Sequence, residues 1–230
     1  MREKEPNPLA TMPDAQTDFS AADSVDVVTA VKRKRPKPGE RRVQILQALA
    51  EMLEQPGAER ITTAALAARL QVSEAALYRH FASKAQMFEG LIEFIEKSVF
   101  SLVNQIVERE QDDAAPGSRT GSRQAAKVIA MVLHFAEKNP GMTRVMVGDA
   151  LVFEHERLQQ RMNQFFDKIE ATIRQGLRGD ANRSETPSTD AQVLAGVLTA
   201  FVIGRLHRFA RSGFRRLPSE HLDASLALML

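Results

Sequence analysis

Residues 60–81 read RITTAALAARLQVSEAALYRHF and contain two short helical segments joined by a tight turn. Thr62 or Thr63 can cap the first segment, because a hydroxyl oxygen accepts a backbone N–H that has no partner in the first helical turn. This segment runs to Leu70, and a two-residue turn separates it from Ser73, which can cap the second segment in the same way. The stretch therefore predicts a helix-turn-helix unit.

The second segment has an inner and an outer face. Leu77 and Phe81 are four residues apart, so they share one face of a helix and are expected to be buried. The side chains expected on the outer, solvent-facing side are Ser73, Glu74, Ala75, Tyr78, Arg79 and His80. The next helix begins at Ser83, with Gln86 three residues later in a capping-box pattern. Two short helices of this kind fit a DNA-binding module whose second helix enters the major groove, and an ordinary helical hairpin has the same spacing.

Positive charge is concentrated just before this unit. Residues 1–31 carry two basic and six acidic side chains, whereas residues 32–90 carry 11 basic and six acidic ones. The basic run consists of Lys32, Arg33, Lys34, Arg35, Lys37, Arg41 and Arg42, with Glu40 as its only acidic residue. Such a run is typical of a nucleic-acid-binding arm, although a solvated tail has the same composition. Besides the outer face of the second segment, the residues expected to contact DNA are Arg41, Arg42, Thr62, Thr63 and Lys84.

The 230-residue chain is 43% hydrophobic and 26% charged, which provides enough apolar surface for a folded core. Residues 1–38 contain five prolines and no sustained periodicity, so we expect a disordered tail there. Beyond this tail, apolar residues recur at helical spacing and no segment alternates as a strand does. Two linkers, 111–122 and 179–189, interrupt the pattern. We expect an all-α fold with a helix-turn-helix unit at 39–85 and a helical bundle for dimerisation and partner binding at 86–230.

The first bundle helix has an apolar stripe and one aromatic residue outside it. The stripe consists of Phe88, Leu91, Ile92, Ile95, Val99, Leu102, Val103 and Ile106. At 100° per residue these side chains fall within about 60° of Phe88, whereas Phe94 lies about 120° away. Another part of the fold covers Phe94, or Phe94 is offered to a partner.

Two later helices are expected over about residues 153–177 and 189–212, and the second is apolar nearly all round. Gly196, Ala200 and Gly204 are four residues apart on one side, where small side chains allow another helix to approach. The apolar residues assigned to the opposite side are Val193, Val197, Leu198, Phe201, Val202 and Phe209. Either the same chain or a second subunit can bury such a helix. A two-fold dimer would place two recognition helices about one turn of DNA apart, which predicts a near-palindromic site.

Several classes of function are excluded by composition. The chain has no cysteine, so disulfides and thiolate metal sites cannot form. None of the five histidines lies in an H-E-x-x-H pattern, and no serine lies in a nucleophile elbow. We therefore expect neither an enzyme nor a cofactor. The longest apolar stretch, 193–204, is shorter than the ~20 residues that span a bilayer, and no secretory signal precedes it, so we expect a cytoplasmic protein without a membrane partner.

Residues 72–84, VSEAALYRHFASK, resemble the recognition helix and the following helix start of the TetR family of bacterial DNA-binding regulators. Residues 90–98 (GLIEFIEKS), 137–144 (EKNPGMTR) and 150–177 are similar to a branch of that family that acts in nucleoid occlusion. The similarity covers roughly residues 41–178. One departure is Gln71, which stands where the turn in this family usually has glycine.

The resemblance implies a homodimer that binds double-stranded DNA on the nucleoid, binds the tubulin-like division GTPase FtsZ and blocks division-ring assembly over the chromosome. The residues that match the FtsZ-binding groove of this branch are Phe94, Lys138 and Asn139, whereas Leu102 and His134 depart from it. The alternative is a metabolite-responsive repressor of the same family, with His134 as a candidate sensing residue. A single tyrosine and no tryptophan offer few polar anchors, which argues against a small-molecule effector.

Overall fold

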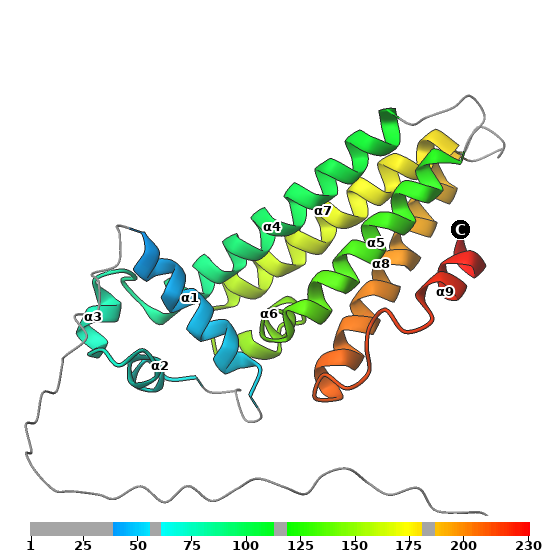
Figure 1. Ribbon diagram of the computed structural model, residues 1–230. Coiled ribbons are helices and arrows are strands. Elements are labelled where there is room, and N and C mark those ends of the chain that lie inside the picture. The colour runs from blue at the N-terminus through cyan, green and yellow to red at the C-terminus, as the bar shows by residue number, and fades with distance from the viewer. Residues whose placement is uncertain (1–38, 56–60, 113–118, 181–186) are drawn as a thin grey trace, which may run out of the picture. The chain divides into compact units, whose positions relative to one another are not determined.

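A computed structural model describes residues 39–55, 61–112, 119–180 and 187–230 (Figure 1). All the regular secondary structure in these ranges is helical, so the predicted all-α fold is confirmed. The tail predicted at 1–38, with the basic run up to Lys37, lies outside the described residues.

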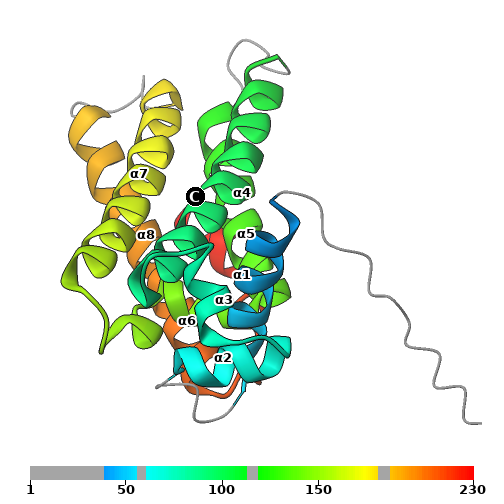
Figure 2. The same ribbon diagram turned by 90° about the vertical axis from the view of Figure 1, so that its left-hand side faces the viewer.

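The helices of the described ranges form a short-helix end and a long-helix bundle. Their bounds are α1 Glu40–Leu53, α2 Thr63–Leu70, α3 Glu74–Tyr78, α4 Lys84–Asp112, α5 Thr120–Lys138, α6 Pro140–Met146, the 3-10 turn η2 Asp149–Leu151, α7 Glu156–Asp180, α8 Pro187–Arg211 and α9 Leu222–Met229. Helices α1–α3 lie together at one end, and the long helices α4, α5, α7 and α8 run side by side away from it (Figures 1 and 2). The first arrangement positions a recognition helix, and the second supplies the core of the bundle.

Buried apolar side chains from three helices build the core of the short-helix end. Ile45, Leu49 and Leu53 of α1 are buried in one cluster with Leu66 of α2 and Leu77 of α3. Three short helices cannot bury much surface separately, so each depends on the other two for its stability. The helix-turn-helix unit is therefore held by α1, which crosses behind α2 and α3 (Figure 2).

Helix α1 also joins this unit to the bundle, because it contacts α4 and α6. A Cβ atom on Gly141 of α6 would lie 1.9 Å from the carbonyl oxygen of Ala50, so only glycine allows α6 to approach α1 this closely. The boundary predicted between residues 85 and 86 falls in the first turn of α4, a continuous helix that belongs to both parts. Residues 39–230 accordingly belong to one compact unit.

The bundle contains a second close approach, between α5 and α7. A Cβ atom on Gly121 would lie 2.1 Å from the carbonyl oxygen of Gly176. The carboxylate of Asp180 accepts hydrogen bonds from the backbone N–H groups of Gly121 (2.9 Å) and Ser122 (2.6 Å) and thus caps α5. These residues were assigned to a linker from the sequence, which was wrong because the capping group comes from a distant helix.

Other helix ends also differ from the prediction. Helix α7 begins at Glu156, so Phe153 precedes it and is exposed. The linker predicted at 179–189 is shorter than expected: α7 continues to Asp180 and α8 begins at Pro187, since proline is well suited to the first turn of a helix. Helix α9 was not predicted. It buries Leu222 and Leu226 in the common core.

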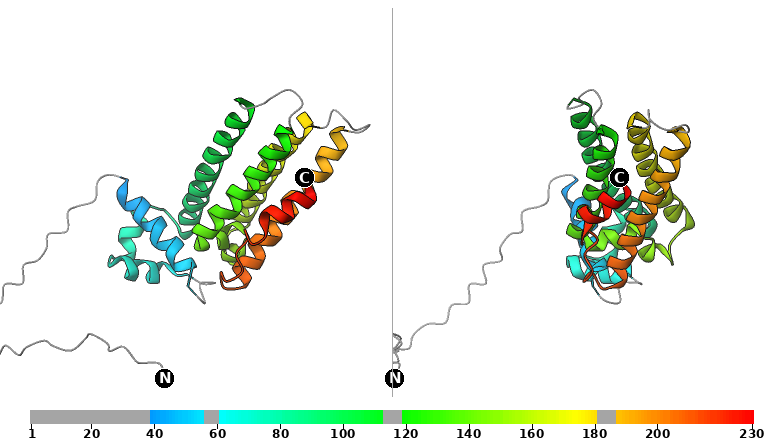
Figure 3. Two further views of the ribbon diagram at one scale, coloured as in Figure 1. Left: turned by 45° about the vertical axis from the view of Figure 1, so that its right-hand side comes forward. Right: turned by 90° about the vertical axis from the view of Figure 1, so that its right-hand side faces the viewer.

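The prediction for the two sides of α8 was wrong. Val193 and Val197 are 61% and 51% exposed. They precede Gly204 by eleven and seven residues, which correspond to three and two helical turns, so all three residues lie on the same side of α8. A Cβ atom on Gly196 or Gly204 would have no neighbour within 4 Å. One face of α8 is therefore apolar, carries small side chains and is exposed, and we call it the open face. The other face packs against α5 and α7 (Figure 3).

This open face also affects the membrane prediction. Within the described part of the chain, the segment Thr189–Arg211 of α8 is long and apolar enough to cross a membrane by length and composition, with a mean hydropathy of 1.4. The sequence prediction counted only the uninterrupted apolar stretch and missed it. The other side of this helix packs against α5 and α7 in the bundle, as in the core helix of a folded domain.

Candidate DNA-binding face and partner groove

The turn between α2 and α3 contains a left-handed residue at the position where related turns usually have glycine. Gln71 has φ 54° and ψ 46°, in the left-handed region. Its N–H donates to the carbonyl oxygen of Ala68 (3.0 Å), and the N–H of Val72 donates to that of Ala67 (3.0 Å). These bonds end α2 and offset the steric cost of a side chain in this region.

Helices α2 and α3 each begin at a residue whose hydroxyl caps the helix. Thr62, rather than Thr63, caps α2, because its hydroxyl accepts the N–H of Ala65 (3.1 Å). Ser73 caps α3 by accepting the N–H of Ala76 (3.3 Å). The capping-box pair before α4 is also present. Ser83 accepts the N–H of Gln86, and the Gln86 side chain accepts the N–H of Ala82 rather than that of the cap residue.

The two faces of α3 are divided as predicted. Leu77 and Phe81 are almost completely buried, although the helix itself ends at Tyr78 and Phe81 lies beyond it. The outer residues Ser73, Glu74, Ala75, Tyr78, Arg79 and His80 are all exposed. A short helix and its flanking residues thus present a mostly polar face, which includes Ala75 and Tyr78, to the solvent.

Four of the predicted DNA-contact side chains make hydrogen bonds within this unit. The guanidinium of Arg42 donates to the carbonyl oxygen of His80 (3.0 Å) and lies over the ring of Phe81, 4.2 Å from its centroid. Thr63 donates a hydrogen bond to the carboxylate of Glu74 (2.6 Å), which connects the first turns of α2 and α3. Arg41 donates to Gln44 within α1.

Lys84 connects the start of α4 to the residues before α7. Its ammonium lies 2.5 Å from a carboxylate oxygen of Glu154, whose side chain is only 10% exposed. Further along the same two helices, Arg161 pairs with Glu96 (2.6 Å), which raises the pKa of Arg161. The partners of these pairs are far apart in sequence, so no local pattern could have identified Glu154.

A groove lies between α1, α4 and α6. Its volume is about 390 Å³, and its lining residues are Val43, Leu46, Gln47, Ala50, Glu51, Glu54, Leu91, Phe94, Asn139 and Met142. Phe94 is 47% exposed, so the explanation that the fold covers it is wrong. Asn139 donates to the carbonyl oxygen of Phe135 (2.7 Å), which fixes the end of α5 beside the groove. Lys138 is exposed at its neighbouring position.

The structure brings Phe94 and Asn139 together, and it adds a wall that sequence reasoning missed. Val43, Leu46 and Gln47 come from α1, so the helix-turn-helix unit itself forms one side of the groove. The sequence gives one indication of this wall, which is that Val43 and Gln47 lie outside the buried side of α1.

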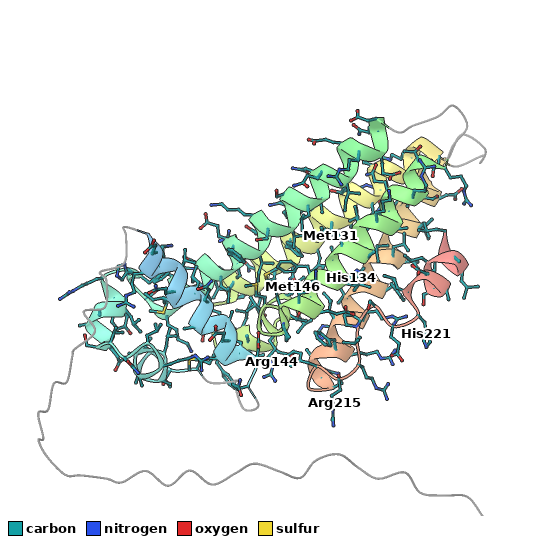
Figure 4. The ribbon with its side chains drawn as sticks, in the orientation of Figure 1. Met131, His134, Arg144, Met146, Arg215 and His221 are labelled. Carbon is teal, nitrogen blue, oxygen red and sulfur yellow. The ribbon has the colours of Figure 1, made fainter. Side chains whose placement is uncertain are left out.

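The two residues that depart from the family pattern are both at the surface. Leu102 is 41% exposed, which corrects its assignment to the buried stripe of α4. His134 is exposed on α5, where its Nδ1 atom lies 2.7 Å from the carbonyl oxygen of Ala130 (Figure 4). Neither residue lines the groove around Phe94.

Comparison with known proteins places this geometry in a family. The profile for bacterial regulatory proteins of the TetR family matches residues 45–91, and the profile described as the tetracyclin repressor-like, C-terminal domain of the SlmA-like type matches residues 122–230. The nucleoid occlusion factor SlmA of Idiomarina loihiensis is 50% identical over 190 residues, which cover 82% of this chain and 93% of that protein. The chain belongs to the SlmA branch of the TetR family.

A second curated relative and two solved structures are also similar to this chain, and the structures share its fold. The nucleoid occlusion factor SlmA of Vibrio cholerae is 50% identical over 191 residues, again 82% of this chain and 93% of that protein. A TetR-family regulator from Mesorhizobium loti shares the fold at a TM-score of 0.60 and 18% identity, over 85% of this chain and 98% of that one. The FadR regulator of Bacillus subtilis, solved with stearoyl-CoA, shares the fold at a TM-score of 0.58 and 14% identity, over 81% of this chain and 96% of that one.

The SlmA branch of the TetR family consists of DNA-binding regulators rather than enzymes, in agreement with the sequence analysis. In the described part of the chain, no three histidine or acidic side chains are grouped as metal ligands.

Proposed function

We propose that this chain is a nucleoid-occlusion factor: a homodimer that binds near-palindromic sites on the chromosome and, through the groove at Phe94, binds FtsZ and blocks division-ring assembly over DNA. The proposal is supported by 50% identity to two proteins named nucleoid occlusion factor SlmA, over most of both chains. It places the protein in the cytoplasm, on the nucleoid.

The outer face of α3 supports the DNA-binding part. Small side chains at Ser73 and Ala75 permit close approach to base edges, and Tyr78 and Arg79 are exposed beside them. We assign Arg41, Arg42, Thr62, Thr63 and Lys84, together with Glu74 and His80, to the same interface. Contacts of this second group fix the position of α3 on the duplex rather than reading its sequence.

The open face of α8 supports the dimer. Val193 and Val197 offer apolar surface, and the glycines beside them leave room for a second helix at close range. A two-fold axis along this face buries the same patch on both subunits. Two copies of α3 are then available for two half-sites of one operator.

The observation that carries the FtsZ-binding part is the position of the groove. It is lined by apolar side chains of α1, α4 and α6, by Gln47 and by the carboxylates of Glu51 and Glu54, with the amide of Asn139 in the lining. A short segment of FtsZ with an apolar side chain fits the apolar part of this lining, and Lys138, exposed beside Asn139, offers a positive charge to the same segment. Because α1 forms one wall, a shift of the helix-turn-helix unit on DNA changes the shape of the groove.

Sedimentation of FtsZ polymers with the purified protein tests the proposal, with and without a duplex that contains a bound chromosomal site. We expect less polymer in the pellet when the duplex is present, and unchanged polymer under both conditions would contradict the FtsZ-binding part. Phe94→Asp should abolish this effect and leave DNA affinity unchanged. Leu228→Asp is the matched control, since Leu228 is an exposed apolar residue on α9 away from the groove.

Genome-wide mapping of bound DNA separates the two regulatory functions. Sites scattered over the chromosome are expected of a nucleoid-occlusion factor, whereas one or two promoter sites are expected of a local repressor.

The salt dependence of binding tests the N-terminal part of the interface. The double variant Arg41→Gln/Arg42→Gln removes two positive charges that we assign to phosphates. The slope of log affinity against log salt should fall by about 0.9 for each phosphate that is no longer neutralised. An unaltered slope would remove both arginines from the interface.

A further inference from the structure

The end of α8 carries a concentration of positive charge that lies outside the DNA interface of the helix-turn-helix unit. Between Asp190 and Glu220 the chain has five arginines and no acidic residue. Arg205 is turned toward α9, where it donates to the carbonyl oxygen of Glu220 (2.6 Å) and to the hydroxyl of Ser225 (3.0 Å). The other four are exposed, and we call them the arginine ledge: Arg208, Arg211, Arg215 and Arg216.

A stiff turn presents the last two of these arginines. The hydroxyl of Ser212 accepts the N–H groups of Arg215 (3.0 Å) and Arg216 (2.9 Å) and donates to the carbonyl oxygen of Phe209. Phe214 has φ 63°, which is unfavourable for a bulky residue. The turn therefore persists only because other contacts stabilise it.

Those contacts come from the bundle. The ring of Phe214 packs edge-on against Phe209, with 5.2 Å between centroids, and the guanidinium of Arg144 on α6 lies 5.2 Å from its centre. Arg144 thereby adds a fifth positive charge beside the ledge. Figure 4 shows Arg144 and Arg215 along the same lower edge of the molecule.

Two carboxylates close to this turn, those of Glu137 and Glu220, contact groups other than the ledge arginines. The carboxylate of Glu137 accepts the N–H of Ser219 (2.9 Å), and that of Glu220 lies 3.9 Å from His221. No salt bridge to Arg208, Arg211, Arg215 or Arg216 is present among the described residues. Guanidinium groups gathered on one edge without carboxylate partners favour an anionic ligand.

The ledge lies at the end of the bundle that carries the helix-turn-helix unit. The views agree that α8 ends beside α6, at the same end as α1 and α2 and opposite the ends of α4 and α7 (Figures 1 and 3). Arg208 and Arg211 follow Gly204 by four and seven residues, so they continue the open face of α8. In a dimer formed through that face, two ledges lie near the two-fold axis and repel each other unless a polyanion separates them.

We propose that the arginine ledge is a second DNA-contact surface, which binds the phosphates between the two half-sites. The inference rests on the proposed function, since it requires the dimer to bind a duplex. When two recognition helices occupy successive major grooves on one side of DNA, the backbone between them faces the two-fold axis. The charge, the exposure and the position of the ledge match that segment of backbone.

The test uses the full chain and a duplex that carries one mapped chromosomal site with flanking sequence on both sides. Phosphate ethylation interference should reveal contacts at the centre of the site as well as at each half-site. The triple variant Arg211→Gln/Arg215→Gln/Arg216→Gln should abolish only the central contacts. Its salt slope should fall by about 0.9 for each phosphate no longer neutralised, up to about 5 for six arginines in a dimer.

Two control variants isolate the effect of position and of charge. Arg109→Gln/Arg178→Gln removes exposed arginines from helices α4 and α7 and should leave both measurements unchanged. The triple lysine variant at the ledge keeps the charge and should restore most of the slope. Thermal unfolding of each variant shows whether the fold is retained.

The outcomes separate this inference from the proposed function. Half-site interference with no central contacts and an unchanged slope in the triple variant would overturn the ledge and leave the DNA-binding function intact. No association with any duplex would overturn the proposed function first. If the triple variant failed to bind phosphatidylglycerol vesicles that the unaltered chain binds, and kept its full DNA affinity, the ledge would be a membrane contact and the inference would be wrong.

Discussion

Two arginine–phenylalanine pairs stabilise the two surfaces that we assign to DNA, and they do so in different ways. Arg42 and Phe81 hold the end of α3, and Phe81 is almost completely buried in the core. Arg144 and Phe214 hold the turn after α8, and Phe214 is half-buried with a left-handed backbone. The first pair belongs to a core that any helix-turn-helix unit requires, whereas the second exists only because α6 lies beside the end of α8.

The two pairs should differ most in the free energy of unfolding that is lost when each phenylalanine ring is removed. Phe81→Ala deletes a fully buried ring, so we expect a loss of about 3–5 kcal/mol in the free energy of unfolding. Loss of DNA binding should accompany it, because α3 no longer has its inner anchor. Urea unfolding measures the first effect and a gel shift the second. A variant that kept its stability would show that Phe81 is not part of this core.

Phe214→Ala should cost less, about 1–2 kcal/mol, since it removes an aromatic pair and a cation contact from a half-buried site but keeps the left-handed strain. Phe214→Gly removes the same contacts and also the strain, so it should be more stable than the alanine variant by about 1 kcal/mol. Thermal unfolding of the two variants side by side checks this order. The reverse order would mean that the turn relaxes when the ring is absent.

A substitution at Gln71 tests backbone strain in the helix-turn-helix unit, as the Phe214 variants test it after α8. The turn after α2 has left-handed strain but no ring to anchor it, because two backbone hydrogen bonds hold it instead. Gln71→Gly should therefore stabilise the protein by about 0.5–1 kcal/mol, the relief of strain being partly offset by the greater freedom of glycine in the unfolded chain. An increase in the urea midpoint at constant DNA affinity is expected. A decrease would mean that the Gln71 side chain makes a stabilising contact that outweighs the strain.

The smallest expected effect is on the stability of the fold at low pH. Neither arginine–phenylalanine pair should contribute to it, because no carboxylate takes part in them. Glu110 on α4 is buried and hydrogen-bonded to Lys127 and Arg123, which lowers its pKa. A lowered pKa in the folded state adds stability above the unfolded-state pKa, and this contribution disappears as the pH falls through the folded value. Glu110→Gln should accordingly flatten the decline of stability below about pH 4.5. An unchanged acid limb of the stability curve would argue that Glu110 makes no such contribution.

The elements that depend on local chemistry were predictable from the sequence. The cap at Ser73, the cap at Thr62 or Thr63 and the buried positions of Leu77 and Phe81 each involve residues within a few positions of one another. A hydroxyl and a four-residue spacing carry this information without any tertiary contact. The turn at Gln71 was indicated only by the resemblance to the family, in which glycine usually stands at this position.

The candidate sites were predictable only in part. The helical period placed Phe94 outside the buried stripe, but it could not identify α1 as the opposite wall of the groove. The partner of Lys84 and the cap of α5 come from Glu154 and Asp180, which are far from them in sequence. The helical period alone places Val193 on the side of Gly204, so its assignment to the opposite side was wrong. Which of the two sides of α8 is buried has no local signal, because the helix is apolar nearly all round.

The amino-acid sequence by itself determined the all-α fold, the helix-turn-helix unit and the residues that α3 turns to the solvent, since hydrophobic period and capping act within single helices. The tertiary structure alone decided that α1 forms a wall of the groove, that one face of α8 stays open and that Arg144 of α6 lies beside the turn that follows α8. Those features arise where separate helices pack, and the energy of packing depends on the three-dimensional fit of side chains that are distant along the chain.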